Sequence, residues 1–220
     1  MTQDGIGAGA HPDHAQLSGT PGDEAAPPRK RPRPGERRVQ ILQTLAAMLQ
    51  HPRGERITTA ALAARLEVSE AALYRHFASK AQMFEGLIEF IEQTIFGLIN
   101  QITTKEEQGV RQLQDIIRML LSFADKNPGM TRVLIGEALV NEDERLQERI
   151  NQLLDRIESS LKQALRIGMS QGAWPADTDA AARAGLLLST IVGRWHRYAK
   201  SGFRRLPGTD LEVMTRTLLA

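Results

Sequence analysis

Hydrophobic residues recur every three or four positions along most of the chain from residue 36 onward, a spacing that places them on one face of an α-helix. A first helix is predicted to end near His51, because Pro52 disfavours helical backbone in the residue before it. The apolar face of this helix is formed by Val39, Leu42, Leu45, Ala46 and Leu49. No segment alternates between polar and apolar residues for long enough to form a strand, so the pattern predicts an all-α chain.

The next three helices are predicted from hydroxyl residues that stand where each helix would begin. Ser and Thr side chains accept hydrogen bonds from the free amides of a first helical turn. The predicted ranges are 60–66 after Thr58 or Thr59, 70 to about 76 after Ser69, and 80 to about 102 after Ser79. The third of these helices is long and amphipathic. Its apolar stripe contains Met83, Phe84, Leu87, Ile91, Ile95, Leu98 and Ile102.

The second half of the chain continues the helical pattern. Its predicted helices span about 106–125, 130–140, 143–169, 178–200 and 210–219, with Asn127-Pro128-Gly129 between the first two. The acidic run 142–148 is expected to be a solvated helix start, where the helix dipole favours negative charge. Phe96 is expected to be exposed. Trp195, His196 and Tyr198 are expected to pack in a dimer interface.

Composition excludes several classes of function. The 220 residues contain no Cys, which rules out disulfides, thiol catalysis and Cys-based zinc sites. The five His residues show no metal-ligand spacing and no catalytic motif is recognisable, so we expect no catalytic residue, metal or cofactor. No apolar run reaches the roughly 18 residues of a membrane helix, and residues 1–28 lack the apolar core of a signal peptide. We therefore expect a soluble, cytoplasmic protein that is not an enzyme and has no membrane partner.

Charge is distributed unevenly, although the formal net charge of the chain is only +2. Residues 1–28 carry a net charge of −4, whereas residues 29–81 hold eleven basic and four acidic residues, a net charge of +7. The remaining 139 residues are almost balanced, with a net charge of −1. A basic block on a balanced chain indicates binding to a polyanion, and the alternative is an ordinary solvated basic surface.

Residues 1–34 are predicted to be a disordered tail, because they are rich in Gly, Pro and Ala and lack apolar periodicity. The tail ends in a basic run from Arg29 to Pro34. We expect the basic residues of 29–38 to tether the chain to a polyanion without sequence preference, the alternative being an arm that reads a DNA groove.

Residues 57–77 have the organisation of a helix-turn-helix, with two helices of about two turns joined by about three residues. Ala63 is small where the helices would cross closely. The predicted apolar core of this unit consists of Leu62, Leu66, Val68, Leu73 and Phe77. The residues left outside are Thr58, Thr59, Ser69, Glu70, Ala71, Ala72, Tyr74, Arg75, His76 and Lys80. Their hydroxyl and cationic groups suit DNA phosphates, and their small side chains let a helix approach base edges.

This segment resembles the DNA-binding domain of the TetR family, on the pattern Val68-Ser69, Leu73-Tyr74-Arg75-His76-Phe77 and Lys80. The resemblance implies a three-helix DNA-binding domain over 35–80 and a helical dimerisation and partner-binding domain over 81–220. Glu67 departs from the glycine that the family usually places in the turn. If its backbone is left-handed, a residue with a Cβ costs about 1–2 kcal/mol there.

The resemblance extends to one branch of the family, the nucleoid occlusion factors of proteobacteria. It rests on Ile57-Thr58-Thr59 and on residues 69–77, 87–92, 127–132 and 149–158, and it covers about residues 37–170. It implies a nucleoid-associated homodimer, with coiled-coil packing of long helices, that binds palindromic double-stranded DNA. While on DNA, such proteins engage the C-terminal tail of the tubulin-like division protein FtsZ and block division over the chromosome.

The family pattern assigns DNA binding to one set of residues and partner binding to another. The DNA-binding set is Arg56, Thr58, Thr59, Ser69, Glu70, Ala71, Ala72, Tyr74, Arg75, His76 and Lys80. Within it, Thr58, Thr59, Tyr74, Arg75 and Lys80 are expected mainly on phosphates. Residues 69–72 are expected at base edges in the major groove, where the Ala methyl groups could touch thymine methyls.

The partner-binding set is Phe90, Lys126 and Asn127. Phe90 lies on the flank of its helix's apolar stripe, where it could receive an apolar residue of the FtsZ tail, and Lys126 could meet acidic groups of that tail. Leu98 stands where the resemblance leads us to expect a basic residue. The alternative for Phe90 is a partly buried residue of the core or of a dimer interface.

Two other functions stay open at this point. A ligand-responsive TetR-type transcriptional repressor would need a small-molecule pocket enclosed by the helices after residue 100. A purely architectural DNA-binding protein would need neither that pocket nor an exposed groove beside Phe90.

Overall fold

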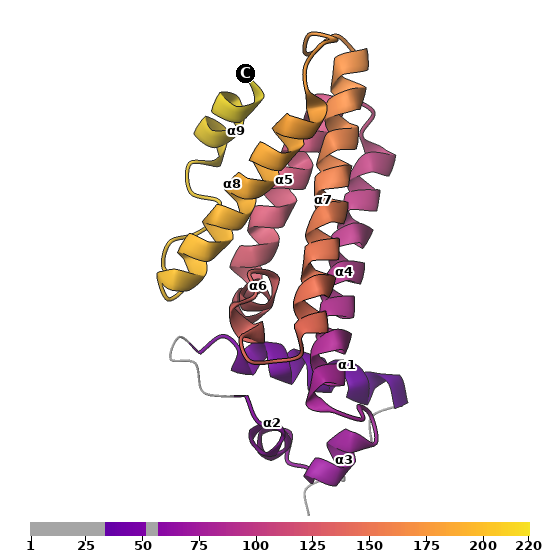
Figure 1. Cartoon of the computed structure of the whole chain (residues 1–220), viewed down its shortest axis with the longest axis vertical. Coiled ribbons are helices and arrows are strands. Elements are labelled where there is room, and N and C mark those ends of the chain that lie inside the picture. The colour runs from indigo at the N-terminus through magenta and orange to yellow at the C-terminus, as the bar shows by residue number, and fades with distance from the viewer. Residues whose placement is uncertain (1–33, 52–56) are drawn as a thin grey trace, which may run out of the picture. The chain divides into compact units, whose positions relative to one another are not determined.

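The computed structural model of this chain describes residues 34–51 and 57–220. These residues form helices and contain no strand, which confirms the predicted all-α class (Figure 1). Nearly all of the predicted tail, residues 1–33, lies outside the described residues. The helices are α1 (Pro34–Met48), α2 (Thr59–Arg65), α3 (Glu70–Tyr74), α4 (Lys80–Lys105), α5 (Gly109–Lys126), α6 (Pro128–Leu134), the short 3-10 helix η1 (Glu137–Leu139), α7 (Glu144–Ser170), α8 (Ala180–Lys200) and α9 (Leu211–Leu219).

The hydroxyl caps predicted from the sequence are present at the starts of α2, α3 and α4. The side-chain oxygens accept from backbone amides: Thr58 from Ala61 at 3.1 Å, Ser69 from Ala72 at 3.3 Å, and Ser79 from Gln82 at 3.1 Å. Each bond satisfies an amide that has no partner inside the helix. These boundaries are therefore set by local chemistry that can be read directly from the chain.

The core lies among the four long helices α4, α5, α7 and α8, which pack side by side (Figure 1). Trp195 is completely buried there and Tyr198 is 3% exposed, whereas His196 is exposed. The prediction that these aromatic side chains pack in a dimer interface is wrong for Trp195 and Tyr198. Because α8 packs against both α5 and α7, it buries them inside its own chain.

Two further predictions need correction. The expected helix over 130–140 is broken into α6 and η1 at Gly136, whose φ of 74° is left-handed backbone that glycine adopts without strain. Val39 is 40% exposed, while Ile41, absent from the predicted face, is completely buried. Because α1 contacts α2, α4 and α6, its buried face is rotated towards Ile41.

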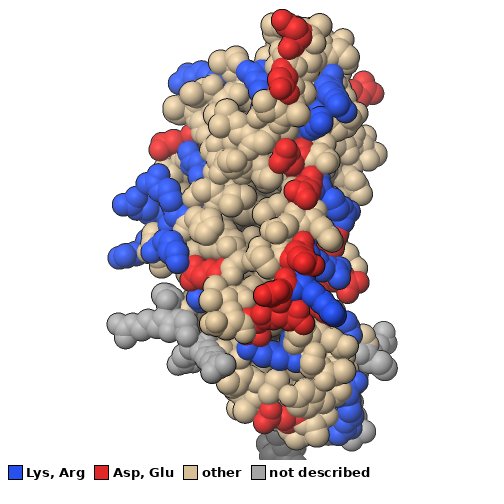
Figure 2. Space-filling model, viewed as in Figure 1, with Lys and Arg blue, Asp and Glu red and all other residues tan. Residues whose placement is uncertain are grey.

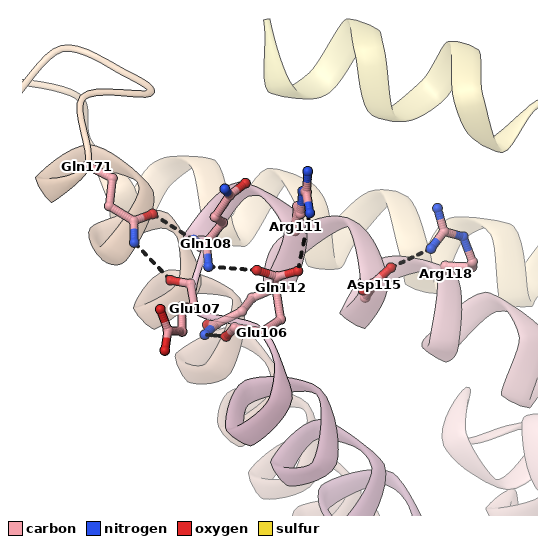
Figure 3. Close-up of polar contacts among 9 residues, drawn as sticks. Glu106, Glu107, Gln108, Arg111, Gln112, Asp115, Arg118 and Gln171 are labelled. Atoms are coloured by element: carbon pink, nitrogen blue, oxygen red, sulfur yellow. Dashed lines mark hydrogen bonds and ion pairs between the residues drawn. The ribbon is translucent and has the colours of Figure 1, made fainter.

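The turn between α4 and α5 is held against the end of α7 by Gln171 (Figure 3). The Gln171 amide nitrogen donates to the Glu107 carbonyl and its oxygen accepts from the Gly109 backbone amide, both at 2.8 Å. Gly109 lets α5 and α7 approach closely, because a Cβ there would lie 2.2 Å from the backbone nitrogen of Gly168. Within the turn, Gln112 donates to the Glu106 carbonyl at 2.6 Å. This end of the bundle is thus fixed by side chain to backbone bonds.

At the other end of the bundle, α6 packs directly on α1. A Cβ on Gly129 would lie only 1.9 Å from the Ala46 carbonyl oxygen, so the two backbones touch. Arg132 donates to the carbonyls of Leu49 and His51, both at 3.1 Å, and forms an ion pair with Glu137 at 3.0 Å. The first helices of the chain are therefore anchored to the helical bundle through one close contact and one arginine.

We expect Gly129→Ala to lower the free energy of unfolding by at least about 2–3 kcal/mol, because the new methyl group would overlap a backbone carbonyl that cannot move alone. Gly97→Ala is the matched control. Gly97 is an exposed position inside α4 with nothing within 4 Å of an added Cβ, so alanine should stabilise by about 0.5–1 kcal/mol. Chemical denaturation measures both changes, and equal stabilities of the two variants would contradict the close contact.

Candidate nucleic-acid interface and partner surface

The α2–α3 unit is a helix-turn-helix with its own small core. Of the predicted core residues, Leu62, Leu66, Leu73 and Phe77 are buried and Val68 is half-buried. The turn is closed by hydrogen bonds from the Val68 amide to the Ala63 carbonyl at 3.0 Å and from Glu67 to Ala64 at 3.1 Å. Glu67 has a φ of 55°, so the left-handed conformation considered from the sequence is present. The turn carries the strain expected of a non-glycine residue.

A hydroxyl and carboxylate network joins α2 to α3. The Thr59 hydroxyl donates to Glu70 at 2.6 Å, and the Tyr74 hydroxyl donates to Thr59 at 3.5 Å. The network is exposed, and it orders these side chains before any ligand is bound. Sequence spacing placed the three residues on one surface but did not indicate that they contact one another.

Most of the predicted DNA-binding residues are at least partly exposed on the α2–α3 helix-turn-helix and the segments next to it. Those that are exposed are Thr58, Ser69, Glu70, Ala71, Tyr74 and Arg75. Those that are half-buried are Thr59, Ala72, His76 and Lys80. Arg56 lies outside the described residues. The arrangement presents hydroxyl groups, a guanidinium group and small side chains together, as contact with a nucleic acid requires.

Lys80 does not project freely. Its ammonium group pairs with Glu142, which precedes α7, and lies 5.7 Å from the centre of the Phe84 ring. The prediction that the acidic run 142–148 is only a solvated helix start is therefore wrong for Glu142. The tertiary fold brings its carboxylate to a cation 62 positions away.

Arg38, which the sequence analysis placed in the basic tether 29–38, makes a supporting contact to the helix-turn-helix that the sequence did not indicate. Its guanidinium group lies 4.2 Å from the centre of the Phe77 ring and donates to the His76 carbonyl at 3.2 Å. It thereby ties α1 to the chain just after α3. Local spacing gives no signal for a contact across 38 positions.

The residues predicted to bind a partner lie on different parts of the bundle. Phe90 is half-buried and packs against the core, which agrees with the alternative considered for it from the sequence. Lys126 is the exposed last residue of α5, and Asn127 donates from its side chain to the Phe123 carbonyl at 2.8 Å. Among the described residues, no hydrogen bond or ion pair joins Phe90 to the other two. A common surface for these residues stays a prediction.

Phe96 is half-buried, so the expectation that it is exposed is wrong. The Arg156 guanidinium group lies 4.0 Å from the centre of its ring and also pairs with Glu92. An arginine from α7 therefore covers this aromatic residue of α4.

The interior of the long-helix bundle is filled by side chains. Ile95, Ile116, Ile157 and Trp195 are completely buried within it. One cavity of about 610 Å³ lies elsewhere, between α1, the start of α4 and the segment after η1, and part of its lining precedes residue 100. Another of about 970 Å³ lies between α5 and α9 and is lined only by residues after 100, so the ligand-responsive alternative stays open.

The described residues contain neither a membrane-spanning helix nor a metal-binding cluster. Their helices include none long and apolar enough to cross a lipid bilayer. Within the same residues, no group of three or more His, Asp or Glu side chains could hold a metal ion.

Two family models match the chain. The model described as bacterial regulatory proteins, tetR family, matches residues 46–87, and the SlmA-like model described as a tetracyclin repressor-like C-terminal domain matches residues 107–219. The second match runs well past residue 170, where similarity was expected to weaken.

Similar proteins are known from several bacteria. The chain is 52% identical over 188 residues to the nucleoid occlusion factor SlmA of Idiomarina loihiensis, covering 84% of this chain and 96% of that one. It is 48% identical over 177 residues to SlmA of Vibrio cholerae, covering 80% and 90%.

Solved structures share the fold at low sequence identity. The fatty acid degradation regulator FadR of Bacillus halodurans matches with a TM-score of 0.72 at 14% identity, covering 87% of this chain and 97% of that one. A TetR-family regulator of Agrobacterium tumefaciens matches with a TM-score of 0.70 at 16% identity, covering 86% and 100%.

The strained turn predicts a difference between two substitutions of Glu67. Glu67→Gly should be more stable than Glu67→Ala by about 1 kcal/mol, because both remove the carboxylate but only glycine escapes the left-handed Cβ penalty. Thermal and urea unfolding of the two proteins measure this difference directly. Equal stability would show that residue 67 is not left-handed in solution.

Proposed function

This chain belongs to the SlmA branch of the TetR family, and from that membership we propose that it binds chromosomal palindromes as a homodimer and blocks division-ring assembly over the nucleoid. One observation carries the proposal. Identity of about 50% to SlmA proteins spans most of the chain, including the helices that follow the DNA-binding domain. Within the TetR family those later helices usually diverge, so their similarity bears on function more closely than the shared fold does.

DNA binding is assigned to α2 and α3. We place α3 in the major groove, with residues 69–72 at base edges and two half-sites about 34–36 Å or a small multiple of that apart. The phosphate contacts are assigned to Thr58, Thr59, Tyr74, Arg75 and Lys80, and Arg56 and His76 complete the set. Ala71 and Arg75 are both exposed on the helix-turn-helix, and this exposure supports the assignment.

Dimerisation is assigned to the helices after residue 80. Large apolar side chains remain exposed on α8 and α9, where Leu186 is 55% and Val213 is 52% exposed. Burying such residues against a second copy would remove apolar surface from water. The dimer presents two DNA-binding units, as a palindromic site requires.

The partner is the C-terminal tail of FtsZ, with Phe90, Lys126 and Asn127 as the contact residues. Phe90 retains part of its surface to receive an apolar residue, and Lys126 is exposed at the end of α5, where it can meet a carboxylate. This activity needs no cofactor, metal or catalytic group, and it places the protein in the cytoplasm on the nucleoid.

Binding of a labelled FtsZ C-terminal peptide, followed by fluorescence anisotropy with and without a palindromic duplex, tests the partner assignment. We expect micromolar affinity, and Phe90→Ala should weaken it at least about tenfold because an aromatic anchor is lost. Phe96→Ala is the matched control, since it removes the same ring from the same helix at a position covered by Arg156.

Equal losses in the two Phe variants would point to damage to α4 and would remove Phe90 from the site. If the wild-type protein binds the duplex but not the peptide under any condition, a ligand-responsive repressor becomes the better account. Melting temperatures of both variants show whether they remain folded.

Thr58→Ala should weaken DNA binding by about tenfold on every sequence, because a phosphate contact carries no base information. The change also removes the α2 cap, which costs about 1 kcal/mol of stability. Thr58→Ser keeps the hydroxyl and should restore both properties. Binding to a panel of single-base variants of the palindrome measures this, and a loss confined to one base position would contradict the phosphate assignment.

A further inference from the structure

A concentrated positive charge lies where α8 ends and the loop to α9 begins. Residues 194–210 contain five Lys or Arg residues and one acidic residue, within a part of the chain whose overall charge is nearly balanced. Arg194, Arg197, Arg204 and Arg205 line a cavity of about 430 Å³ together with Leu206, Pro207, Thr209 and Asp210. We call this the arginine pocket. Figure 2 shows the basic group at the left of the molecule, at the end of α8.

The pocket rests on an ordered loop. The Arg194 guanidinium group donates to the Pro207 carbonyl at 2.9 Å and also to the Thr209 carbonyl. The Ser201 hydroxyl accepts from the backbone amides of Arg204 at 3.1 Å and Arg205 at 2.9 Å. Arg194 and Ser201 therefore hold the loop in place, so that the following arginines project from a fixed backbone.

Most of this charge is not neutralised within the chain. Within residues 34–51 and 57–220, neither Arg197 nor Arg205 forms an ion pair, and both are exposed. Arg204 donates from Nε to the Ser201 carbonyl at 2.9 Å, which leaves the rest of its guanidinium group available. Like charges held together repel, so the arrangement favours an external anion. Guanidinium forks match the oxygens of phosphate groups in particular.

The arginine pocket lies at the same end of the bundle as the DNA-binding unit. Lys200, at the end of α8, pairs with Glu137 at 3.7 Å, and Glu137 pairs with Arg132 at 3.0 Å. Arg132 in turn donates to the Leu49 carbonyl just after α1. The buried Tyr198 adds a hydrogen bond to the Asp125 carbonyl at 3.1 Å, and burial raises the pKa of its hydroxyl group. A short chain of polar contacts thus connects the end of α8, beside the pocket, to the residues just after the first helix.

We propose that the arginine pocket is a second phosphate-binding surface, which contacts the backbone of the same DNA duplex that α2 and α3 bind. The inference rests on the DNA binding described above and adds a contact region outside the helix-turn-helix. Its guanidinium groups read no bases, so its contribution is independent of sequence and sensitive to salt. Duplex DNA is favoured over an acidic peptide because DNA is already held at this end of the molecule.

The test compares two triple variants that remove the same charge. The pocket variant combines Arg197→Gln, Arg204→Gln and Arg205→Gln. It removes the accessible cations of the pocket but keeps Arg194, which holds the loop. The control changes three exposed basic residues at the far end of the bundle: Lys105→Gln, Arg111→Gln and Arg166→Gln. The probe is a 40-bp duplex, about four helical turns, selected from a random pool by the wild-type protein.

Affinity is measured between low and moderate salt. Each phosphate contact contributes about −0.9 to the slope of log affinity against log salt concentration. The pocket variant should therefore bind with a slope shallower by about one to three per protomer and with at least about tenfold lower affinity at low salt. The control should keep the wild-type slope. Unchanged melting temperatures and dimer mass establish that both variants remain folded.

A pocket variant with the wild-type slope, or a control variant whose slope falls equally, overturns the inference. A pocket variant that loses binding to an acidic peptide or to anionic lipid vesicles while its DNA slope is unchanged also overturns it. Failure of the wild-type protein to bind any selected duplex would instead remove the DNA function itself. The two failures are therefore distinguishable.

Discussion

The backbone contact between Gly129 and Ala46 is the constraint on which the rest of the structure depends. It sets how the first helix sits on the bundle, because any side chain at position 129 would collide with the Ala46 carbonyl oxygen. Arg132, one turn further along α6, donates to the carbonyls just after α1 and so satisfies groups that the helix end leaves open. The helix-turn-helix comes after α1 in the chain and α2 packs against α1, so the contact between α6 and α1 helps to set the position of the helix-turn-helix on the bundle.

Electrostatic pairs then decide which cations remain available for a ligand. Lys80 pairs with Glu142 and Lys200 with Glu137, whereas Arg75 and Arg205 are exposed and form no ion pair with a residue that the structure describes. A cation that already has a partner must break that pair before it can bind a phosphate, and an unpaired one need not. The chain therefore contains two classes of basic residue, and this distinction comes from tertiary contacts.

A similar division separates the two aromatic residues of α4. Both rings are half-buried and pack against the core, but only Phe96 has a cation over its face, from Arg156, whose guanidinium group also pairs with Glu92. An aromatic side chain gains most from a partner when part of its surface is still in water. This contrast gives the partner proposal its control residue.

The sequence alone determined the all-α class, most of the helices, the caps at Thr58, Ser69 and Ser79, and the unusual residue Glu67 in the turn, because each depends on residues within a few positions of one another. It also identified the helix-turn-helix surface, although Arg56 lies outside the described residues. Only the tertiary structure buried Trp195 and Tyr198 within their own chain and brought Glu142 to Lys80. Those outcomes depend on how helices far apart in the chain pack together, and neither local periodicity nor average charge indicates that packing.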